Sequence, residues 1–410
     1  MTEVRIGVIG NVDSGKSTLI GVLKNDILDN GRGSARLTIL QHNHEKETGR
    51  TSSISKHYIS KNEDKVVCLI DLAGHEKYLK TTLHGLSSHY TDYAIIVIAA
   101  NMGVSKMTKE HLSIVLALKI KFIIVVSKID IAPKNIYEQT IKDIEKLIKI
   151  TKRYDDIKFI NNNDNENENI EINDIYNKNL IPIFKLSNTT GENVNILKEK
   201  LANLNSIYNW EDRINEPVNF KIDDKFKVKG VGTVISGKLI GGIINKGDTV
   251  YLGPFTKNGK WFKILVKTIH NDFREYVEKL TPGMAGCLAI KSLEKKDELN
   301  LNSHFRKGLV IMQNAQKPIY EFQAKIHIMN THSTTIKNNF QPIINCNGVV
   351  QSAIIKLDKE LYLRGGSKDI VNFKFKYRPE YIKANDIFIL REGRTRGLGK
   401  IININNDNNE

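Results

Sequence analysis

The sequence predicts an α/β domain, with a doubly wound and mostly parallel sheet, followed by two small antiparallel β-barrels. Three observations predict this order. In the first half of the chain, short apolar runs alternate with amphipathic stretches of helical period. Near residues 209–217 that alternation stops. In the second half, short β-rich runs are separated by turns that contain glycine, proline and asparagine.

The expected strands of the first domain are almost continuously apolar, as is typical of strands that are covered on both faces. They are RIGVIG (5–10), KVVCLID (65–71), YAIIVIAA (93–100), KFIIVVS (121–127) and IPIFKLS (181–187). Within residues 136–150, Ile141, Ile144, Leu147 and Ile148 recur at the spacing of one helix face. The polar, low-complexity stretch 161–169 is expected to form a mobile loop.

The domain boundaries follow from these changes of pattern. We expect the first domain at 1–208, a linker at 209–216, the barrels at 217–314 and 315–404, and a disordered tail at 405–410.

Composition restricts the class of protein. A chain of 410 residues that is 40% apolar and 26% charged is expected to be globular. No run approaches the ~18 consecutive apolar residues of a membrane span, and the N-terminus resembles a strand instead of a signal peptide. We therefore expect a cytoplasmic protein without a membrane partner. Cys68, Cys287 and Cys346 lack CxxC spacing, which disfavours disulfide and zinc frameworks.

The net charge of +15 is concentrated in the second half. Residues 1–208 hold 28 Lys and Arg against 25 Asp and Glu, whereas residues 209–410 hold 33 against 21. A local excess of this kind predicts a polyanionic partner, most often nucleic acid. A general enrichment in lysine is the alternative explanation.

The segment GNVDSGKS (10–17) fits the pattern G-x-x-x-x-G-K-[ST] between a predicted strand and a predicted helix. In that context the backbone N–H groups of the loop and the helix N-terminus face nucleotide phosphates. The Lys16 ammonium would neutralise the β- and γ-phosphates, and the Ser17 hydroxyl would bind Mg²⁺. The residues expected around the phosphates are Asn11, Val12, Asp13, Ser14, Gly15, Lys16, Ser17 and Thr18.

The segment DLAGHEKY (71–78) begins where a predicted strand ends. An aspartate in this place can hold Mg²⁺ through water, so we assign that role to Asp71. The N–H of Gly74 can contact a γ-phosphate. His75 follows directly, and it is either a catalytic group or a polar residue of a surface turn.

The segment SKID (127–130) also follows a predicted strand, and it predicts the choice of base. The Asp130 carboxylate can accept from both N1–H and the 2-amino group of guanine, which adenine does not offer. The stem of Lys128 can pack over the base. We therefore expect GTP and GDP, together with Mg²⁺, as the cofactors.

The order of GNVDSGKST, GRTSSI, DLAGHEKY, SKID and KLSNTTGEN resembles the five signature segments of translational GTPases, the class of elongation factors Tu and one-alpha. HEKETGRTSSIS, DLAGHEKYLKTT, MTKEHL and SNTTGEN resemble, more narrowly, the eukaryotic GTP-binding protein one and two branch. IDDKFKVKGVGTVISG and LREGRTRGLGKI extend the resemblance to the second half. It implies a P-loop GTPase domain followed by two barrels, with switch regions near 44–56 and 71–90.

The resemblance implies roles for the switch residues. His75 takes the place of the histidine that orients the attacking water, mainly when the ribosome positions it. Ser53 takes the place of the switch-one threonine that binds Mg²⁺. Ser52 replaces an apolar residue that faces Val12 in front of the histidine, so this gate is expected to be looser.

The resemblance also implies the rest of the guanine site. Ser127 replaces an asparagine or threonine, which shortens one contact to the P-loop region. Ser187 and Asn188 belong to the fifth segment, where the backbone N–H of Asn188 could reach the guanine O6.

In the second half, the resemblance implies a tRNA site. IDDKF (222–226) matches a segment that lines the pocket for the aminoacyl end of tRNA in elongation factor Tu. Asp223 and Asp224 could attract an α-ammonium group, and Ser236 could border the same pocket. Phe226 could stack on the terminal adenine, although an inward Phe of a barrel strand is as often part of the core.

Basic residues of the last barrel are expected to contact tRNA phosphates. They are Arg391, Arg394, Arg396, Lys325, Lys337 and Lys400. Charged solvent faces are common in barrels, so the charge pattern alone leaves both interpretations open.

We therefore expect a monomeric GTPase, slow without an activator, that acts as a translation-factor-like switch with aminoacyl-tRNA and the ribosome as partners. Two alternatives stay open: a GTP-dependent scaffold for RNA surveillance or decay machinery, and a regulatory GTPase of a metabolic enzyme without tRNA binding. The first strand begins almost at residue 1, so partners that dock on the N-terminal extension of the eukaryotic branch are expected to be absent.

Overall fold

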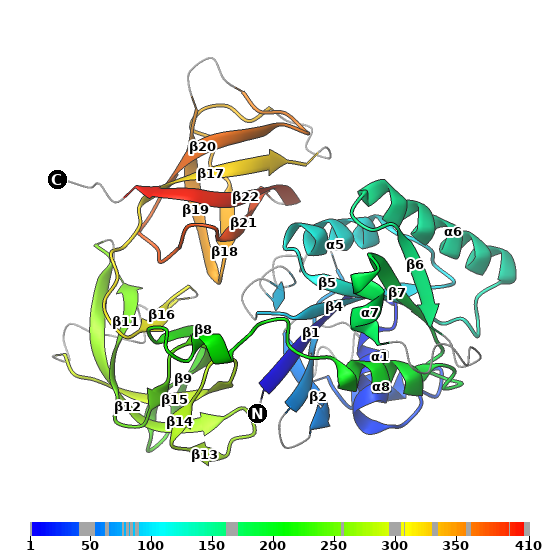
Figure 1. Cartoon of the computed structure of the whole chain (residues 1–410), viewed down its shortest axis with the longest axis horizontal. Helices are drawn as coiled ribbons and strands as arrows, with labels where there is room; N and C mark the ends of the chain where they lie inside the picture. Colours follow the sequence, from blue (N-terminus) through cyan, green and yellow to red (C-terminus); the bar gives the residue numbers. More distant parts are fainter. Residues whose placement is uncertain are drawn as a thin grey trace. The chain divides into compact units, whose positions relative to one another are not determined.

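The computed structural model divides into two compact units, Met1–Tyr208 and Asn209–Glu410 (Figure 1). The structure describes residues 2–40, 54–61, 65–75, 78, 82, 85–86, 90–160, 171–255, 258–294, 305–306, 308–329, 335–357, 362–392 and 394–405. The predictions for Ser52, Ser53, the stretch 161–169 and residues 406–410 lie outside these ranges, as does most of the switch region 44–56.

Unit 1 is built on a seven-stranded sheet in which every strand except β2 runs parallel to its neighbours. The order is β2 (Ser55–Lys61), β3 (Lys65–Asp71), β1 (Thr2–Gly10), β4 (Tyr93–Ala99), β5 (Lys121–Ser127), β7 (Leu180–Lys185) and β6 (Asp156–Ile160). The five predicted apolar runs form the inner strands, which confirms the doubly wound sheet. The edge strands lack such a run: β2 alternates buried and half-buried residues, because only one of its faces packs on the core.

Helices cover both faces of this sheet (Figure 1). One face packs on α1 (Lys16–Asn25), α7 (Ile172–Asn177) and α8 (Val194–Asn203), whose apolar residues join one core cluster with β1, β4 and β5. The other face packs on α5 (Lys106–Ala117) and α6 (Lys134–Thr151). The predicted periodicity holds in α6, where Ile144 and Ile148 are buried. A short helix, α2 (Ser34–Leu37), follows α1. Within the described ranges, no helix is both long and apolar enough to cross a membrane.

Unit 2 begins with a 3-10 helix, η2 (Glu211–Arg213), inside the predicted linker, and continues into the first barrel. Its main strands are β8 (Asn219–Val228), β9 (Gly232–Gly241), β11 (Thr249–Phe255), β12 (Lys260–Asn271), β15 (Ala285–Ser292) and β16 (Val310–Met312), and the pairing of β11 with β12 closes them. The short strands β10 (Ile244–Asn245), β13 (Tyr276–Val277) and β14 (Lys279–Leu280) lie at the rim.

The second barrel closes in the order β17 (Glu321–Ile328), β20 (Lys368–Phe375), β19 (Val349–Lys356), β18 (Ile343–Cys346), β21 (Ile387–Glu392) and β22 (Arg394–Asn405). Phe322, Phe373 and Phe388 pack against one another in its core. Both predicted barrels are therefore confirmed.

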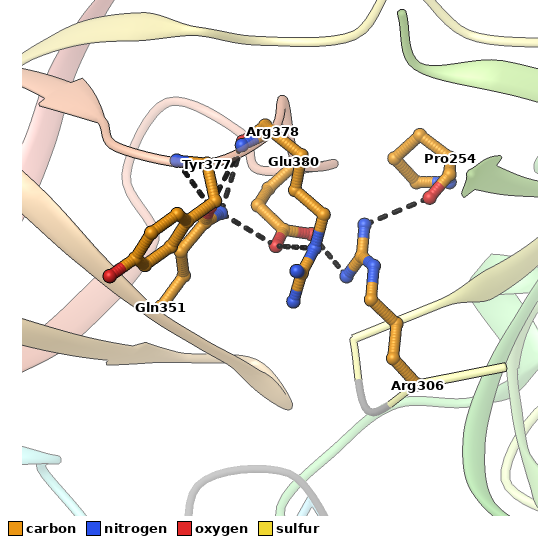
Figure 2. A network of polar contacts seen from close by, with 6 residues as sticks. All are labelled: Pro254, Arg306, Gln351, Tyr377, Arg378 and Glu380. Atoms are coloured by element: carbon orange, nitrogen blue, oxygen red, sulfur yellow. Dashed lines mark hydrogen bonds and ion pairs between the residues drawn. The ribbon is translucent and has the colours of Figure 1, made fainter. Parts of the chain in front are cut away.

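A buried polar network joins the two barrels within unit 2 (Figure 2). The guanidinium of Arg306 donates to Glu380 Oε2 over 2.6 Å and to the carbonyl of Pro254 over 2.8 Å. Gln351 Nε2 donates to Glu380 Oε1 over 2.8 Å, and Arg378 Nε lies 3.5 Å from the same oxygen. The Glu380 side chain is fully buried, so its charge depends on these partners.

Candidate functional site

The loops at the carboxyl ends of β1, β3, β5 and β7 carry the predicted nucleotide residues, at the edge where open α/β sheets bind ligands. The first of these loops, residues 10–17, is shaped by its own groups. Asn11 Oδ1 accepts from the N–H of Val12 over 2.9 Å, and Asp13 has a left-handed backbone with φ 58°. Ser14 is buried behind them.

Lys16 is buried at the start of α1, and its Nζ donates to the carbonyl of Asn11 over 2.7 Å. Burial lowers the pKa of Lys16 to about 8, against the opposing charges of Asp71 and Asp13. A Cβ on Gly74 would lie 2.4 Å from this Nζ and 2.6 Å from the carbonyl of Gly10. Only glycine therefore allows the DLAG segment to approach the P-loop lysine this closely.

The two predicted Mg²⁺ ligands in the described ranges lie together. The Ser17 hydroxyl donates to Asp71 Oδ2 over 2.7 Å. A hydroxyl and a carboxylate are oxygen ligands of the kind that Mg²⁺ takes, and nucleotide phosphates commonly complete its coordination. The residues thus fit the ion. Among the described residues there is no cluster of three or more His, Cys, Asp or Glu side chains that could hold a metal by itself.

The base end of the site is held by short hydrogen bonds. Ser127 Oγ donates to the carbonyl of Ser14 over 2.7 Å, so the serine at this position reaches the P-loop. Thr189 Oγ1 donates to Asp130 Oδ2 over 2.7 Å. Burial raises the pKa of Asp130, but hydrogen bonds from Thr189 and Ser187 outweigh it, so the pKa lies below its usual value and the carboxylate is charged.

A pocket of about 270 Å³ lies between these segments. Five of the predicted residues line it: Gly15, Thr18, Lys128, Asp130 and Asn188. The sequence interpretation missed the others, which are Asp29, Gly31, Arg32, Gly33, Arg36, Ile131 and Thr189. Most of these belong to DNGRGSAR (29–36). This segment combines an asparagine and two glycines, which favour tight turns, with two arginines, and that combination is a sequence signal for a loop that faces a phosphate.

Comparison with known proteins agrees with this geometry. Residues 1–207 match the family described as the Elongation factor Tu GTP binding domain. The chain is 37% identical to GTP-binding protein 1 of Xenopus laevis, over 97% of this chain and 63% of that protein. It is 35% identical to GTP-binding protein 2 of Homo sapiens, over 98% of this chain and 69% of that protein.

This chain is a translational GTPase. It belongs with the branch of GTP-binding proteins 1 and 2, and unit 1 is the part that matches the family's GTP binding domain. The fold agrees with that of the elongation factor SelB of Methanococcus maripaludis in complex with a GTP analogue, with a TM-score of 0.69 and 19% identity over 98% of this chain and 79% of that one. The chain spans less than two thirds of the length of GTP-binding protein 1.

His75 of this translational GTPase is half-buried and directly follows Gly74, the residue beside Lys16. Its carbonyl accepts from the N–H of Tyr78 over 2.8 Å, and the two rings meet edge to face with centroids 6.2 Å apart. His75 is therefore placed on the segment that approaches the phosphate-binding loop.

The predicted aminoacyl residues lie on β8 and β9 of the first barrel. Asp224 pairs with Ser236 across the two strands, and a β-bulge at Asp223 interrupts the ladder next to them. Phe226 is 47% exposed, which excludes the alternative that it is plain core. Bulges often redirect a side chain beside a binding site.

The basic residues of the second barrel differ in exposure. Arg391 is only 8% exposed, which disfavours the predicted surface contact to a phosphate. Arg394 and Arg396 lie in β22, and their side chains are outside the described part. Lys325 on β17 and Lys400 on β22 are exposed and lie directly opposite each other.

Proposed function

We propose that this chain hydrolyses GTP to GDP and phosphate as a switch in translation, binding aminoacyl-tRNA and acting with the ribosome in the cytoplasm. The family match to an elongation factor domain and the likeness to the elongation factor SelB support this proposal. The surfaces of unit 2 supply the argument for RNA.

The observation that carries the proposal is the exposed group on β8 and β9. A half-exposed aromatic ring at Phe226 offers a stacking surface for a base. The exposed Asp224 carboxylate lies two residues away, with Ser236 opposite. An aromatic platform beside a carboxylate matches the two ends of an aminoacylated adenosine, which are a base and an α-ammonium group.

A row of cations on the second barrel supports the RNA partner independently. The directly opposed pair Lys325 and Lys400 is unfavourable in the absence of an anion, because like charges across a ladder repel. On the other side of β17, His327 pairs with Lys368 of β20, and burial together with the charge of Lys368 lowers the pKa of His327. A phosphate backbone would relieve this repulsion.

The test is binding of aminoacyl-tRNA and deacylated tRNA in the presence of GTP and then GDP. With GTP, the charged tRNA should bind more tightly, and Asp224→Ala should remove that preference without changing the salt dependence. Lys400→Gln should weaken both tRNAs alike and lower the slope of log K against log salt by roughly 1. With GDP, both tRNAs should bind poorly, because the switches that position the barrels are ordered by the γ-phosphate.

Each variant has a matched control at the rim of the first barrel. Glu278→Ala removes an exposed negative charge, as Asp224→Ala does, and Lys279→Gln removes an exposed positive charge, as Lys400→Gln does. Both controls should bind like the unmodified protein. Equal affinity for charged and deacylated tRNA would favour the RNA-decay scaffold. Absence of tRNA binding in either nucleotide state would favour a regulatory GTPase of a metabolic enzyme.

A further inference from the structure

One wall of the nucleotide pocket is a segment to which the signature motifs give no role. We name residues 29–36, DNGRGSAR, the arginine loop. It follows α1, and Asp29, Gly31, Arg32, Gly33 and Arg36 all line the pocket. The loop therefore brings two arginines to a cavity that Lys128 and Asp130 also line.

The arginine loop is a fixed structure. The Asp29 carboxylate accepts from the N–H groups of Gly31, Gly33 and Ala35 at 2.9, 3.0 and 2.9 Å. The N–H of Asp29 donates to the carbonyl of Asn188 over 2.9 Å, which ties the loop to the guanine segment. These three hydrogen bonds fix the conformation of the loop. They also occupy most of the lone pairs of the buried Asp29 carboxylate, so Asp29 is poorly available as an ion-pair partner for the arginines.

The side chains of the two arginines differ from that of Asp29 in this respect. Within the part of the chain that the structure describes, neither Arg32 nor Arg36 makes a hydrogen bond or ion pair through its side chain, and the Nε of Arg36 is buried without a partner. A Cβ on Gly33 would lie 2.6 Å from this Nε, and the φ of Gly33 is 85°, so the glycine both permits the turn and leaves room for the guanidinium. An unpaired buried donor is costly unless a ligand pairs it.

The position of the loop indicates the ligand group. Gly15 and Thr18 mark the phosphate end of the pocket, whereas Lys128, Asp130 and Asn188 mark the base end. The part of a guanine nucleotide between these ends is the ribose with its α-phosphate. Lys16, the cation of the P-loop, does not line this pocket.

We infer that Arg36 and Arg32 form a second phosphate subsite of the guanine nucleotide pocket, at its ribose end and separate from the P-loop lysine. The group bound is a phosphate oxygen, either on the nucleotide's own α-phosphate or on a ribose hydroxyl of a nucleotide that carries an additional phosphate there. Guanidinium groups suit this task because they donate in a planar fork that matches phosphate geometry. The inference rests on the GTPase domain and is independent of the proposed tRNA function.

The experiment measures the affinity of the full chain for four ligands: guanosine, GMP, GDP, and GDP with a diphosphate on the ribose 3′-oxygen. Competition against GDP labelled with a radioisotope is suitable, since a dye on the ribose would occupy the proposed subsite. The variants are Arg36→Gln and Arg32→Gln. Lys142→Gln is the control, because it removes an exposed positive charge on α6 that does not line the pocket.

If the α-phosphate is the ligand group, Arg36→Gln should weaken GMP and GDP by about tenfold or more and leave guanosine unchanged, with a smaller effect from the exposed Arg32. If a ribose phosphate is the ligand group, only the ligand with the 3′-diphosphate should lose affinity. Melting temperatures without nucleotide should not fall, because neither arginine has a hydrogen-bond or ion-pair partner to lose among the described residues. Unchanged affinity of both variants for all four ligands, as in the control, would overturn the inference.

Discussion

The Ser17 hydroxyl at the start of α1 donates a 2.7 Å hydrogen bond to Asp71 at the end of β3. The two residues are 54 positions apart in the chain. The parallel pairing of β1 with β3 brings the two segments together, because parallel strands place their carboxyl ends at one edge. This contact marks where Mg²⁺ is expected.

Removing the Ser17 hydroxyl should therefore affect nucleotide binding through the metal. Ser17→Ala is expected to weaken GTP by about tenfold, ~1.4 kcal/mol, when Mg²⁺ is present. With a chelator the variant and the unmodified protein should bind GTP alike. Calorimetric titration in both conditions measures this. An equal loss with and without Mg²⁺ would show that Ser17 acts through the loop structure and not through the metal.

Asp130 should decide the choice of base. Asp130→Asn is expected to weaken GDP by roughly 100-fold, because each hydrogen bond to a charged acceptor contributes about 1.5–3 kcal/mol. The same variant should gain affinity for xanthosine diphosphate, whose 2-oxo group accepts from the new amide. Competition between GDP and xanthosine diphosphate for each protein measures this change of base preference. Equal affinity of the unmodified protein for ADP and GDP would contradict the assignment.

His75 is expected to act on hydrolysis and not on binding. If the imidazole orients the attacking water, as the family resemblance implies, His75→Ala should leave the affinity for GTP nearly unchanged and abolish hydrolysis stimulated by ribosomes. Single-turnover hydrolysis with and without ribosomes measures this. Stimulated turnover that persists within about threefold of the unmodified rate, roughly 0.65 kcal/mol, would rule out the catalytic role.

The Glu380 network should control the stability of unit 2 (Figure 2). Burial raises the pKa of Glu380 to about 7, while Arg306 and Arg378 lower it. Arg306→Met leaves the carboxylate without its 2.6 Å partner and is expected to cost about 3–5 kcal/mol above neutral pH. The loss should shrink toward about pH 5, because the Glu380 carboxyl is then protonated and no longer needs a cationic partner. A carboxyl whose pKa is higher in the folded state than in the unfolded state destabilises the fold as pH rises.

Tryptophan fluorescence during urea unfolding measures this effect, since both tryptophans, Trp210 and Trp261, belong to unit 2. The double variant Arg306→Met with Glu380→Gln is the control, and it should recover most of the stability at high pH. A loss in Arg306→Met that is the same at both pH values would mean that the charge of Glu380 is not the cause.

His111 should make unit 1 sensitive to acid. Burial and then the charge of Lys16 lower the pKa of His111 to about 3. As pH falls below about 6.5, the His111 side chain of the unfolded chain takes up a proton, whereas the folded chain keeps this imidazole neutral. Acid therefore favours the unfolded state, and the free energy of unfolding of unit 1 decreases as pH falls below about 6.5. The slope is about 1.4 kcal/mol per pH unit for one such group.

Hydrogen exchange of amides in β1 and β4 at about pH 7 and about pH 5.5 measures this loss, after correction for the intrinsic exchange rate. In His111→Leu the pH dependence should be smaller. Part of it should remain, because burial and the charge of Lys24 also lower the pKa of His57, to about 4. An unchanged pH dependence in His111→Leu would contradict the prediction.

The sequence determined the inner sheet and the phosphate-binding loop by itself. The runs that form β1, β3, β4, β5 and β7 are buried on both faces, so continuous apolarity identifies them without tertiary information. GNVDSGKS and SKID identify their chemistry because each places fixed residue types directly after a strand. The order of these segments, with DLAG between them, was also sufficient to indicate the family.

Only the tertiary structure decided the contacts between distant segments. The exposure of Phe226 and the burial of Arg391 depend on strand register in closed barrels, where a shift of one residue reverses the face of every side chain. The place of Arg36 in the pocket depends on the turn that Asp29 holds through three backbone N–H groups. A local sequence pattern predicts such a turn, but the cavity that it faces forms only when the carboxyl ends of β1, β5 and β7 come together.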